Sequence, residues 1–364
     1  MTAPSSSTLP GPPFLAGPLR QASHRDFDVA RLAATRTDRV TVAIPARNED
    51  GTVGDIVAAL HRDLVVGGLV DELIVMDDHS TDNTAREAEA AGATVVASSS
   101  LLPEFGSGHG KGEVLWKSLF ASTGDVIVWC DADITDFSSH FVTGLLGPLL
   151  SNTDVQFTKG HYRRPGENGT GGGRVTELVA RPLLSMFFPH LALVAQPLSG
   201  EFGGRRSVLE RLSFVRGYGV DVGLLIDIAA AMGTESITQV DLDVRTHRNR
   251  PLSELGPQAA AVAAAILARV DPRLIGERMT LERPDLSVAE VDLGEGVPLL
   301  RNTRGNTAAE RAQLVLAESQ ILREAGRHND AYIALDSALT SQPDNPELLY
   351  EAALTAERIG KPEI

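Results

Sequence analysis

The chain has little cysteine, few aromatic residues and little basic charge. Its 364 residues include a single cysteine, Cys130, which excludes an internal disulfide and predicts a cytoplasmic protein in a reducing compartment. Lys and Arg number 33 against 48 Asp and Glu, so the formal net charge is −15. This balance argues against a nucleic-acid partner and against an anionic membrane, because both need a basic face. An anionic substrate would have to meet a local cluster of cations.

Long apolar runs are also missing. The most apolar segment, 182–198, contains Pro189, His190 and Gln196, and is too short and too interrupted to span a bilayer. It is expected to form a core or interface helix. Residues 1–23 are rich in Pro, Ser and Gly and lack the basic start and apolar stretch of a signal peptide, which predicts a disordered arm.

What the chain does contain is a regular alternation of apolar runs and helix-forming segments between Arg39 and Asp136. Strands are expected at 40–44, 72–76, 93–97 and 125–130. This rhythm predicts an α/β fold in which a mainly parallel sheet is flanked by helices on both faces. Ligands bind beyond the carboxyl ends of such strands. The loops at 45–49, 77–78 and 131–133 all fall at that edge.

The most informative string is Asp131-Ala132-Asp133, directly after the expected strand at 125–130. Mg²⁺ and Mn²⁺ prefer oxygen ligands and usually bind through one or two carboxylates together with phosphate oxygens. These two carboxylates could therefore hold a divalent cation against a diphosphate. An Asp-x-Asp string can also simply cap the next helix, and the neighbouring motifs favour the metal site.

Two glycine-flanked cations are candidate anion contacts. Lys111 stands between two glycines at an expected helix start, where a diphosphate would be favoured, and an exposed surface lysine is the alternative. The glycines at 171–173 run directly into Arg174 and Thr176. Backbone N–H groups, a guanidinium and a hydroxyl together indicate a receptor for a phosphate monoester or a carboxylate, and a plain glycine linker is the alternative.

The end of the chain has a helical repeat pattern. Gly326 and Gly360 lie 34 positions apart, which is the tetratricopeptide period, and Ala331 and Pro343 fall at its characteristic spacing. Residues 310–364 therefore resemble a tetratricopeptide element, with an ordinary helical hairpin as the alternative. One and a half repeats cannot bury their own faces, so this tail should dock, dimerise or fray.

In this order, the strings resemble a nucleotide-sugar glycosyltransferase of the GT-A fold, and most closely the glucosyl-3-phosphoglycerate synthase family, over about residues 25–275. Some strings occur widely among such transferases: Ile44-Pro-Ala-Arg-Asn-Glu49, Asp77-Asp-His-Ser-Thr-Asp-Asn-Thr84, Gly110-Lys-Gly-Glu113 and Asp131-Ala-Asp133. Others are more particular to the family: Gly172-Gly-Arg-Val-Thr-Glu-Leu-Val179, Gln196-Pro-Leu-Ser-Gly-Glu201, Gly217-Tyr-Gly-Val-Asp221 and His247-Arg-Asn-Arg250.

The resemblance implies a retaining enzyme that transfers glucose from UDP-glucose, or GDP-glucose, to 3-phosphoglycerate with the help of Mg²⁺ or Mn²⁺. It implies front-side attack, in which the acceptor oxygen approaches on the face that the leaving group vacates and the leaving phosphate can take the acceptor proton. A homodimer is expected, and the Ala-rich helix over 258–270 could serve it. Neither nucleic acid nor membrane is an expected partner.

The resemblance also distributes the site residues. It places Asp221 and Leu198 at catalytic positions, and Asp133 and His247 at the metal. The acceptor is expected to bind at Gly173, Arg174, Thr176 and Asn249. The donor is expected to bind at Pro45, Ala46, Arg47, Asn48, Glu49, Asp77, Asp78, Lys111, Asp131 and Ala132.

This chain departs from the family at two of these positions. Where the family has serine, this chain has Asp78, so either Asp77 or Asp78 could meet the nucleotide. Where the family has glutamate, it has the shorter Asp221, which can shift the placement of the sugar.

The expected organisation is an arm over 1–23, a nucleotide-sugar-binding half over 24–150 and an acceptor-binding half over 151–280. A linker over 281–309 and the helical tail over 310–364 follow.

Three other functions fit parts of the pattern. A transferase with a polyprenyl phosphate or glycan acceptor would want an apolar or basic surface, which the net charge of −15 disfavours. A non-catalytic scaffold that uses its tail would not need to keep Asp131, Asp133, Lys111 and His247. A nucleotidyltransferase would usually carry a glycine-rich basic loop after the first strand, unlike residues 45–49.

Overall fold

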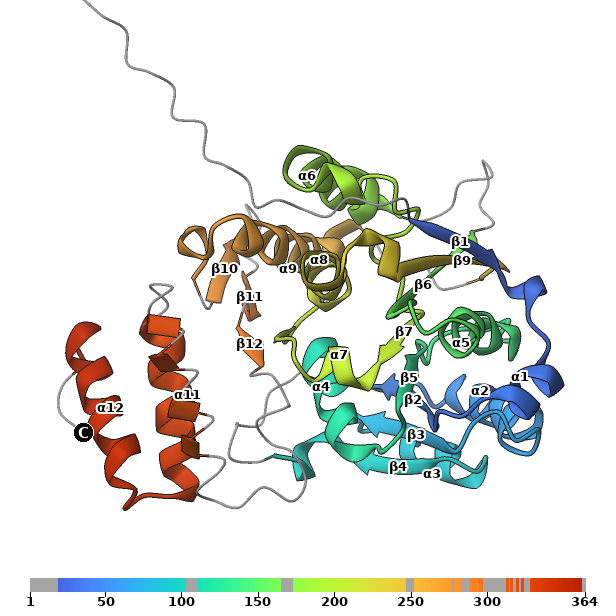
Figure 1. Cartoon of the computed structure of the whole chain (residues 1–364), viewed down its shortest axis with the longest axis horizontal. Helices are drawn as coiled ribbons and strands as arrows, with labels where there is room; N and C mark the ends of the chain where they lie inside the picture. Colours follow the sequence, from blue (N-terminus) through green and yellow to red (C-terminus); the bar gives the residue numbers. More distant parts are fainter. Residues whose placement is uncertain are drawn as a thin grey trace, which may run out of the picture.

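The structure is a computed structural model that describes residues 19–102, 110–164, 173–246 and 252–276, together with parts of 278–361 (Figure 1). The glycines at 171–172 and the string at 247–250, which carries His247 and Asn249, lie outside the described residues. So do residues 1–18 of the expected arm and most of the expected linker over 281–309.

An eight-stranded sheet forms the centre of the molecule, with the strand order β1-β9-β6-β7-β5-β2-β3-β4. Only β7 runs antiparallel to its neighbours, and every other pair in this sheet is parallel. The mainly parallel α/β sheet expected from the sequence is therefore confirmed. The strands are β1 (Arg20–Ser23), β2 (Val40–Ala46), β3 (Glu72–Asp77), β4 (Thr94–Ala97), β5 (Val126–Trp129), β6 (Phe157–Arg163), β7 (Phe202–Arg205) and β9 (Ile237–Val244).

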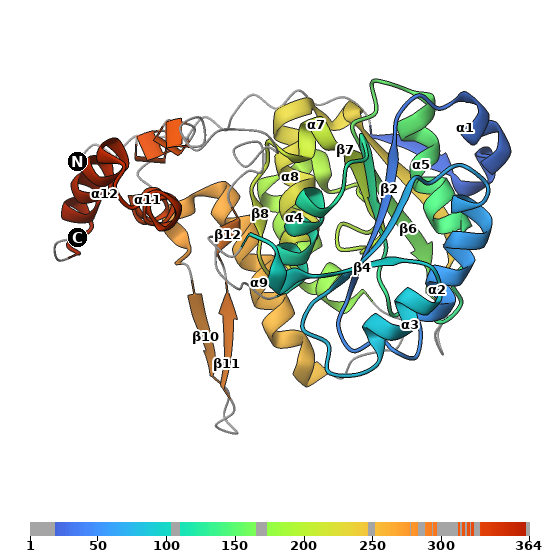
Figure 2. The same ribbon diagram turned by 90° about the horizontal axis from the view of Figure 1, so that it is seen from below.

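Helices cover both faces of the sheet, and the alternation along each strand explains why. Successive side chains of β5 point to opposite faces, so Val126 and Val128 join one core while Ile127 and Trp129 join the other. Figure 2 shows the two layers of helices on opposite sides of the strands. The first layer holds α1 (Val29–Thr35), α2 (Val53–Leu60), α3 (Thr84–Ala90) and α5 (His140–Ser151). The second holds α4 (Lys111–Ala121), α6 (Arg181–Phe187), α7 (Arg206–Leu209), α8 (Val220–Met232) and α9 (Leu252–Val270).

Three sequence expectations are corrected. The disordered arm was expected to reach residue 23, but β1 (Arg20–Ser23) pairs with β9 at the edge of the sheet. The segment 182–198 is not one helix, because α6 ends at Phe187 and a short 3-10 helix, Pro189–Leu191, follows at a proline that cannot continue it. Finally, α9 uses its apolar face within the chain, where Val262, Ala265 and Ile266 are buried in the core against α8.

Small elements complete the described part of the chain. β10 (Arg278–Glu282) pairs with β11 (Val288–Asp292), and β12 (Glu295–Gly296) pairs with β8 (Phe214–Val215), both antiparallel. No helix within the described ranges combines the length and the apolar character needed to cross a bilayer.

The expected helical tail is present. α11 (His328–Ser341) and α12 (Pro346–Arg358) pack through Leu335, Leu339 and Leu348. The side chain of Asn345 caps α12 by accepting from the N–H groups of Glu347 and Leu348 at 3.1 and 3.2 Å. Its assignment to the tetratricopeptide class stays a prediction.

Candidate active site

Acidic and basic side chains from distant segments meet at the carboxyl edge of the sheet. The parallel register of β2 and β3 sets Ala46 beside Asp77, and β5 ends at the same edge just before Asp131-Ala132-Asp133. The hydroxyl of Thr52 donates to the Ala132 carbonyl at 2.6 Å. This bond fixes the loop that carries both aspartates.

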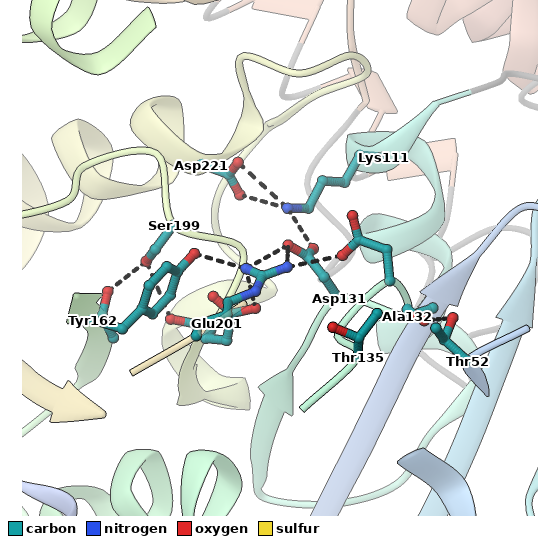
Figure 3. A network of polar contacts seen from close by, with 12 residues as sticks. Thr52, Lys111, Asp131, Ala132, Thr135, Tyr162, Ser199, Glu201 and Asp221 are labelled. Carbon is teal, nitrogen blue, oxygen red and sulfur yellow. Dashed lines mark hydrogen bonds and ion pairs between the residues drawn. The ribbon is translucent and has the colours of Figure 1, made fainter. Parts of the chain in front are cut away.

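Lys111 joins two of the carboxylates. Its Nζ lies 3.0 Å from Asp131 Oδ1 and 3.3 Å from Asp221 Oδ1, and Figure 3 shows the lysine between the two aspartates. Lys111 is the first residue of α4, whereas Asp221 lies in the first turn of α8. Burial opposes a charged lysine, but the two carboxylates prevail and raise the pKa of Lys111 well above its usual value. The lysine is therefore a fixed positive charge at the site.

Arg245, just after β9, is the second fixed cation, and its side chain is 4% exposed. One of its two Nη atoms lies 3.2 Å from Asp131 Oδ2 and 2.8 Å from Asp133 Oδ1, and the other lies 2.7 Å from Glu201 Oε1. The guanidinium also donates to the hydroxyl of Tyr162 at 2.7 Å. A buried guanidinium needs such partners, because an unpaired charge is costly away from water.

The carboxylates differ in their environment. Burial raises the pKa of Glu201 and of Asp221, whereas Lys111 and Arg245 outweigh burial at Asp131 and hold its pKa well below the usual range. Asp131 is thus fully ionised and already neutralised by two cations. Asp133 is more exposed, with 38% of its side chain accessible against 25% for Asp131, and is the carboxylate best placed to meet a further cation.

The charged groups line a pocket of about 560 Å³. This volume is typical of a small-molecule site. Most of the residues expected from the sequence for donor binding, catalysis and the metal contribute to its wall: Pro45, Ala46, Arg47, Glu49, Asp78, Lys111, Asp131, Ala132, Asp133, Leu198 and Asp221.

The side chains of two expected donor residues instead accept hydrogen bonds from the backbone at residues 80–81. The side-chain oxygen of Asn48 accepts from Thr81 N at 2.9 Å, and Asp77 Oδ1 accepts from Ser80 N at 3.2 Å. Neither Asn48 nor Asp77 belongs to the described pocket wall, whereas Asp78 is buried in it and accepts from Gly110 N at 3.2 Å. Of Asp77 and Asp78, it is therefore Asp78 that lines the pocket.

The expected acceptor residues flank this wall. Gly173, Arg174 and Thr176 surround Val175, which lines the pocket, at the start of the helical turn η5 (Thr176–Ala180). Arg174 is exposed and Thr176 is buried. Asn249 and His247 lie outside the described residues.

The donor atoms at the site suit a hard divalent cation. In the part of the chain that the structure describes, no three His, Cys, Asp or Glu side chains gather as a complete metal site. Mg²⁺ and Mn²⁺ do not require one, since they commonly take one or two carboxylates and complete their shell with phosphate oxygens and water. The residues present therefore fit such an ion at Asp133.

The sequence interpretation missed Arg245 and Tyr162, and it quoted Glu201 within a string without a role. The only available signal was that the alternating pattern over 238–246 predicts a strand, which contains Arg245 near its end and leads into the string at 247–250. Cys130 lies buried beside this cluster, where burial raises its thiol pKa. Cys130 therefore serves core packing.

Comparison with known proteins agrees with this geometry. Residues 41–212 match the family model described as glycosyl transferase family 2. Glucosyl-3-phosphoglycerate synthase of Mycolicibacterium smegmatis is 51% identical over 249 residues, which cover 67% of this chain and 82% of that protein. The enzyme of the same name from Mycobacterium tuberculosis strain H37Rv is 46% identical over 262 residues, covering 69% and 80%.

Solved structures give the same result. The crystal structure of glucosyl-3-phosphoglycerate synthase from Mycobacterium tuberculosis in complex with Mn²⁺, UDP-glucose and phosphoglyceric acid matches with a TM-score of 0.72 and 41% identity. The match covers 79% of this chain and 99% of that one. A complex of that enzyme with Mg²⁺ and UDP matches with a TM-score of 0.72 at 40% identity, covering 78% and 99%.

The sheet order and the acidic loop after β5 define a glycosyltransferase of the GT-A fold, as the sequence predicted. Within that class, the chain belongs to the glucosyl-3-phosphoglycerate synthase family.

Gly200 gives a direct test of the cluster. A Cβ at this position would lie 2.1 Å from Asp131 Oδ2, so Gly200→Ala must displace the Asp131 carboxylate from Lys111 and Arg245. A misplacement of about 1 Å can cost roughly 100-fold in rate, and we expect a loss of that order in glycosyl transfer. Gly51→Ala is the control, because a Cβ there meets nothing within 4 Å. Equal activity of both variants, measured as nucleotide release, would contradict the assignment.

Proposed function

We propose that the protein transfers glucose from UDP-glucose to 3-phosphoglycerate with retention, giving glucosyl-3-phosphoglycerate and UDP. The observation that carries the proposal is the arrangement of Lys111, Asp131, Asp133 and Asp221 around one pocket at the carboxyl edge of the sheet. The relatives named glucosyl-3-phosphoglycerate synthase support it, and one of them was solved with Mn²⁺, UDP-glucose and phosphoglyceric acid. A front-side mechanism is part of the proposal.

The donor would lie along the ends of β2, β3 and β5. A uracil ring offers an N3–H donor and carbonyl acceptors, which a strand-end carboxylate and backbone groups can match. The buried carboxylate of Asp78 and the wall over 45–49 are the groups placed for this contact. Lys111 would meet the diphosphate as a point charge at the start of α4.

Transfer breaks the bond between the sugar C1 and the diphosphate oxygen, and negative charge grows on the diphosphate. A divalent cation supplies Lewis-acid stabilisation of that charge when bound. Asp133 and His247 would hold the cation, while Asp131 stays paired with Lys111 and Arg245. The ion would be Mg²⁺ or Mn²⁺, since one solved complex of the relative contains Mn²⁺ and another contains Mg²⁺.

Asp221 and Leu198 would act on the sugar side. The carboxylate of Asp221 lines the pocket and is steered by Lys111, which suits it to hold sugar hydroxyls. Leu198 also lines the pocket and has only backbone groups to offer, so any polar contact must come from its main chain. Asp221 stays paired with Lys111, and the proposed mechanism forms no covalent bond between the enzyme and the sugar.

The phosphate of the acceptor would bind at the start of η5. Arg174 can form charge-assisted hydrogen bonds to a phosphate monoester, and Gly173, Thr176 and Asn249 would complete the clamp. The exposed position of Arg174 beside Val175 supports this assignment, since Val175 lines the pocket.

Activity on a panel of substrates tests the function. With 3-phosphoglycerate, nucleotide release should require both the acceptor and Mg²⁺ or Mn²⁺, and it should be fastest with UDP-glucose. A preference for GDP-glucose would correct the donor. Release only with a polyprenyl phosphate or a glycan acceptor would reject the proposed acceptor, and no release with any of them would favour a scaffold.

Arg174→Ala tests the acceptor site. Loss of a charged hydrogen bond costs about 1.5–3 kcal/mol, so KM for 3-phosphoglycerate should rise roughly 10- to 100-fold, while KM for UDP-glucose stays within about twofold. Arg62→Ala, at an exposed arginine paired with Asp63, is the control. Equal losses of affinity for donor and acceptor would exclude Arg174 from the acceptor site.

We further propose a homodimer in the cytoplasm. The single cysteine is free and buried, which suits a reducing compartment. Apolar side chains on and around α6, at the outside of the molecule in Figure 1, support an interface because they are strongly exposed: Leu178 at 72%, Met186 at 63%, Phe187 at 41% and Leu193 at 82%.

Light scattering after size exclusion tests the dimer. The expected mass is twice that of the 38.7 kDa chain, and Met186→Glu should shift it toward one chain because a carboxylate would be buried in the interface. Leu274→Glu, at a residue 60% exposed elsewhere, should leave the mass unchanged. A wild-type protein with the mass of a single chain would contradict the dimer.

A further inference from the structure

The turn at 196–201, which carries Leu198 and Gly200 to the pocket, is hydrogen-bonded along its length to strand β6. The Gln196 amide donates to the Tyr162 carbonyl at 2.6 Å and accepts from Tyr162 N at 3.3 Å. Further along the turn, Ser199 Oγ donates to the Gly160 carbonyl at 2.6 Å. The turn is therefore held in one position relative to the sheet.

Lys159 adds a charged contact in the middle of this turn, besides the ion pair of Glu201 with Arg245. Its Nζ donates to the carbonyl of Ser199 at 2.9 Å and lies 4.4 Å from the centre of the Phe202 ring. The lysine is 1% exposed. Among the described residues it has no carboxylate within 4.0 Å, and the described pocket wall does not include it.

A second buried lysine shows how unusual this arrangement is. Lys117 is 0% exposed and donates to a backbone carbonyl, that of Ser98, at 3.1 Å. It differs from Lys159 in having a carboxylate partner, since Glu113 Oε1 lies 3.1 Å away. A buried charge without such a partner costs stability, which would favour its replacement unless the group has a function.

The turn has two contacts that transfer would depend on. Leu198 lines the pocket, and Glu201 pairs with Arg245 at 2.7 Å. Arg245 in turn holds Asp131 and Asp133. Ser199 lies between Leu198 and Glu201 in the chain, so a displacement at Ser199 moves both.

We propose that Lys159 is a positioning residue of the transferase, whose ammonium group fixes the turn at 196–201 through the Ser199 carbonyl. In this role it aligns the Leu198 backbone with the sugar and keeps Glu201 on Arg245, without touching either substrate. The inference rests on the proposed glucosyl transfer.

The pH at which Lys159 loses its charge gives the role an observable signature. Burial lowers the pKa of Lys159 to about 8, partly offset by nearby carboxylates. An ordinary lysine keeps its charge to a pH of about 10.4. The charged groups that face it are Asp221 of α8, Lys111 of α4, Glu201 before β7 and Asp131 after β5. The Ser199 carbonyl therefore keeps a charged donor below pH 8 and loses that charge as the pH rises further.

The charge of Lys159 has the opposite effect on the stability of the fold. Because the pKa of Lys159 is lower in the folded protein than in the unfolded chain, its charged form disfavours folding at neutral pH. This penalty is relieved as the pH rises from about 8 toward the unfolded value. The lysine thus favours activity and opposes stability in the same pH range.

The test compares Lys159→Met with the wild-type enzyme and with Lys117→Met. In Lys159→Met, which keeps the length of the side chain without its charge, we expect kcat to fall roughly 10- to 100-fold. UDP affinity, measured by calorimetry with Mg²⁺, should stay within about threefold, because Lys159 is outside the pocket wall. The melting temperature should change little, since the lost hydrogen bond and the relieved charge act in opposite directions.

The pH profile separates positioning from a merely structural role. The wild-type kcat with Mg²⁺ should fall as the pH rises through about 8, and Lys159→Met should lack this limb. Lys117→Met should keep both the limb and kcat but melt at a lower temperature, because the buried Glu113 loses its nearer cation and keeps only Arg216, 3.9 Å away.

Either of two results would overturn the role of Lys159 and leave the proposed function standing. One is a Lys159→Met enzyme with wild-type kcat, and the other is an equal loss of kcat in Lys159→Met and Lys117→Met. If Lys159→Met does not fold, the wild-type profile decides, and the absence of a limb near pH 8 rejects the role of Lys159. A wild-type enzyme that forms no product from UDP-glucose and 3-phosphoglycerate would instead overturn the proposed function, and this inference with it.

Discussion

The site depends on charge compensation at the carboxyl edge of the sheet. Lys111 and Arg245 neutralise Asp131 from two sides, at 3.0 and 3.2 Å, in a chain whose net charge is −15. Without these cations, the carboxylates would repel one another and any anionic donor. With them, a nucleoside diphosphate can approach. Asp133 pairs with Arg245 through one oxygen at 2.8 Å, and as the more exposed aspartate it can meet a divalent cation with the other.

Much of this arrangement follows from local sequence. Apolar runs that each end in a polar loop predicted strands β2, β3 and β5, and parallel strands place their end loops at one edge. The order of the elements was therefore enough to predict that Lys111, Asp78 and Asp131 lie at the pocket. The short strand β1 was missed, because Arg20–Ser23 carries no apolar pattern and is a strand only through its pairing with β9.

The partners of the loops could not be predicted in the same way. Arg245 meets Asp131 across 114 positions of the chain, and nothing near Arg245 indicates a buried guanidinium. Asn48 and Asp77 have the residue types of donor contacts, yet their side chains accept hydrogen bonds from the backbone of Thr81 and Ser80. Residue type thus indicates which groups can serve a site, whereas the tertiary contacts decide which of them face it.

The most direct test of the central claim is the calorimetric affinity for UDP with and without Mg²⁺, in the wild-type protein and in Asp133→Asn. If compensated Asp131 leaves Asp133 to ligate the ion, Mg²⁺ should strengthen UDP binding by at least about tenfold in the wild type and far less in the variant. An equal effect of Mg²⁺ on both proteins would contradict the account.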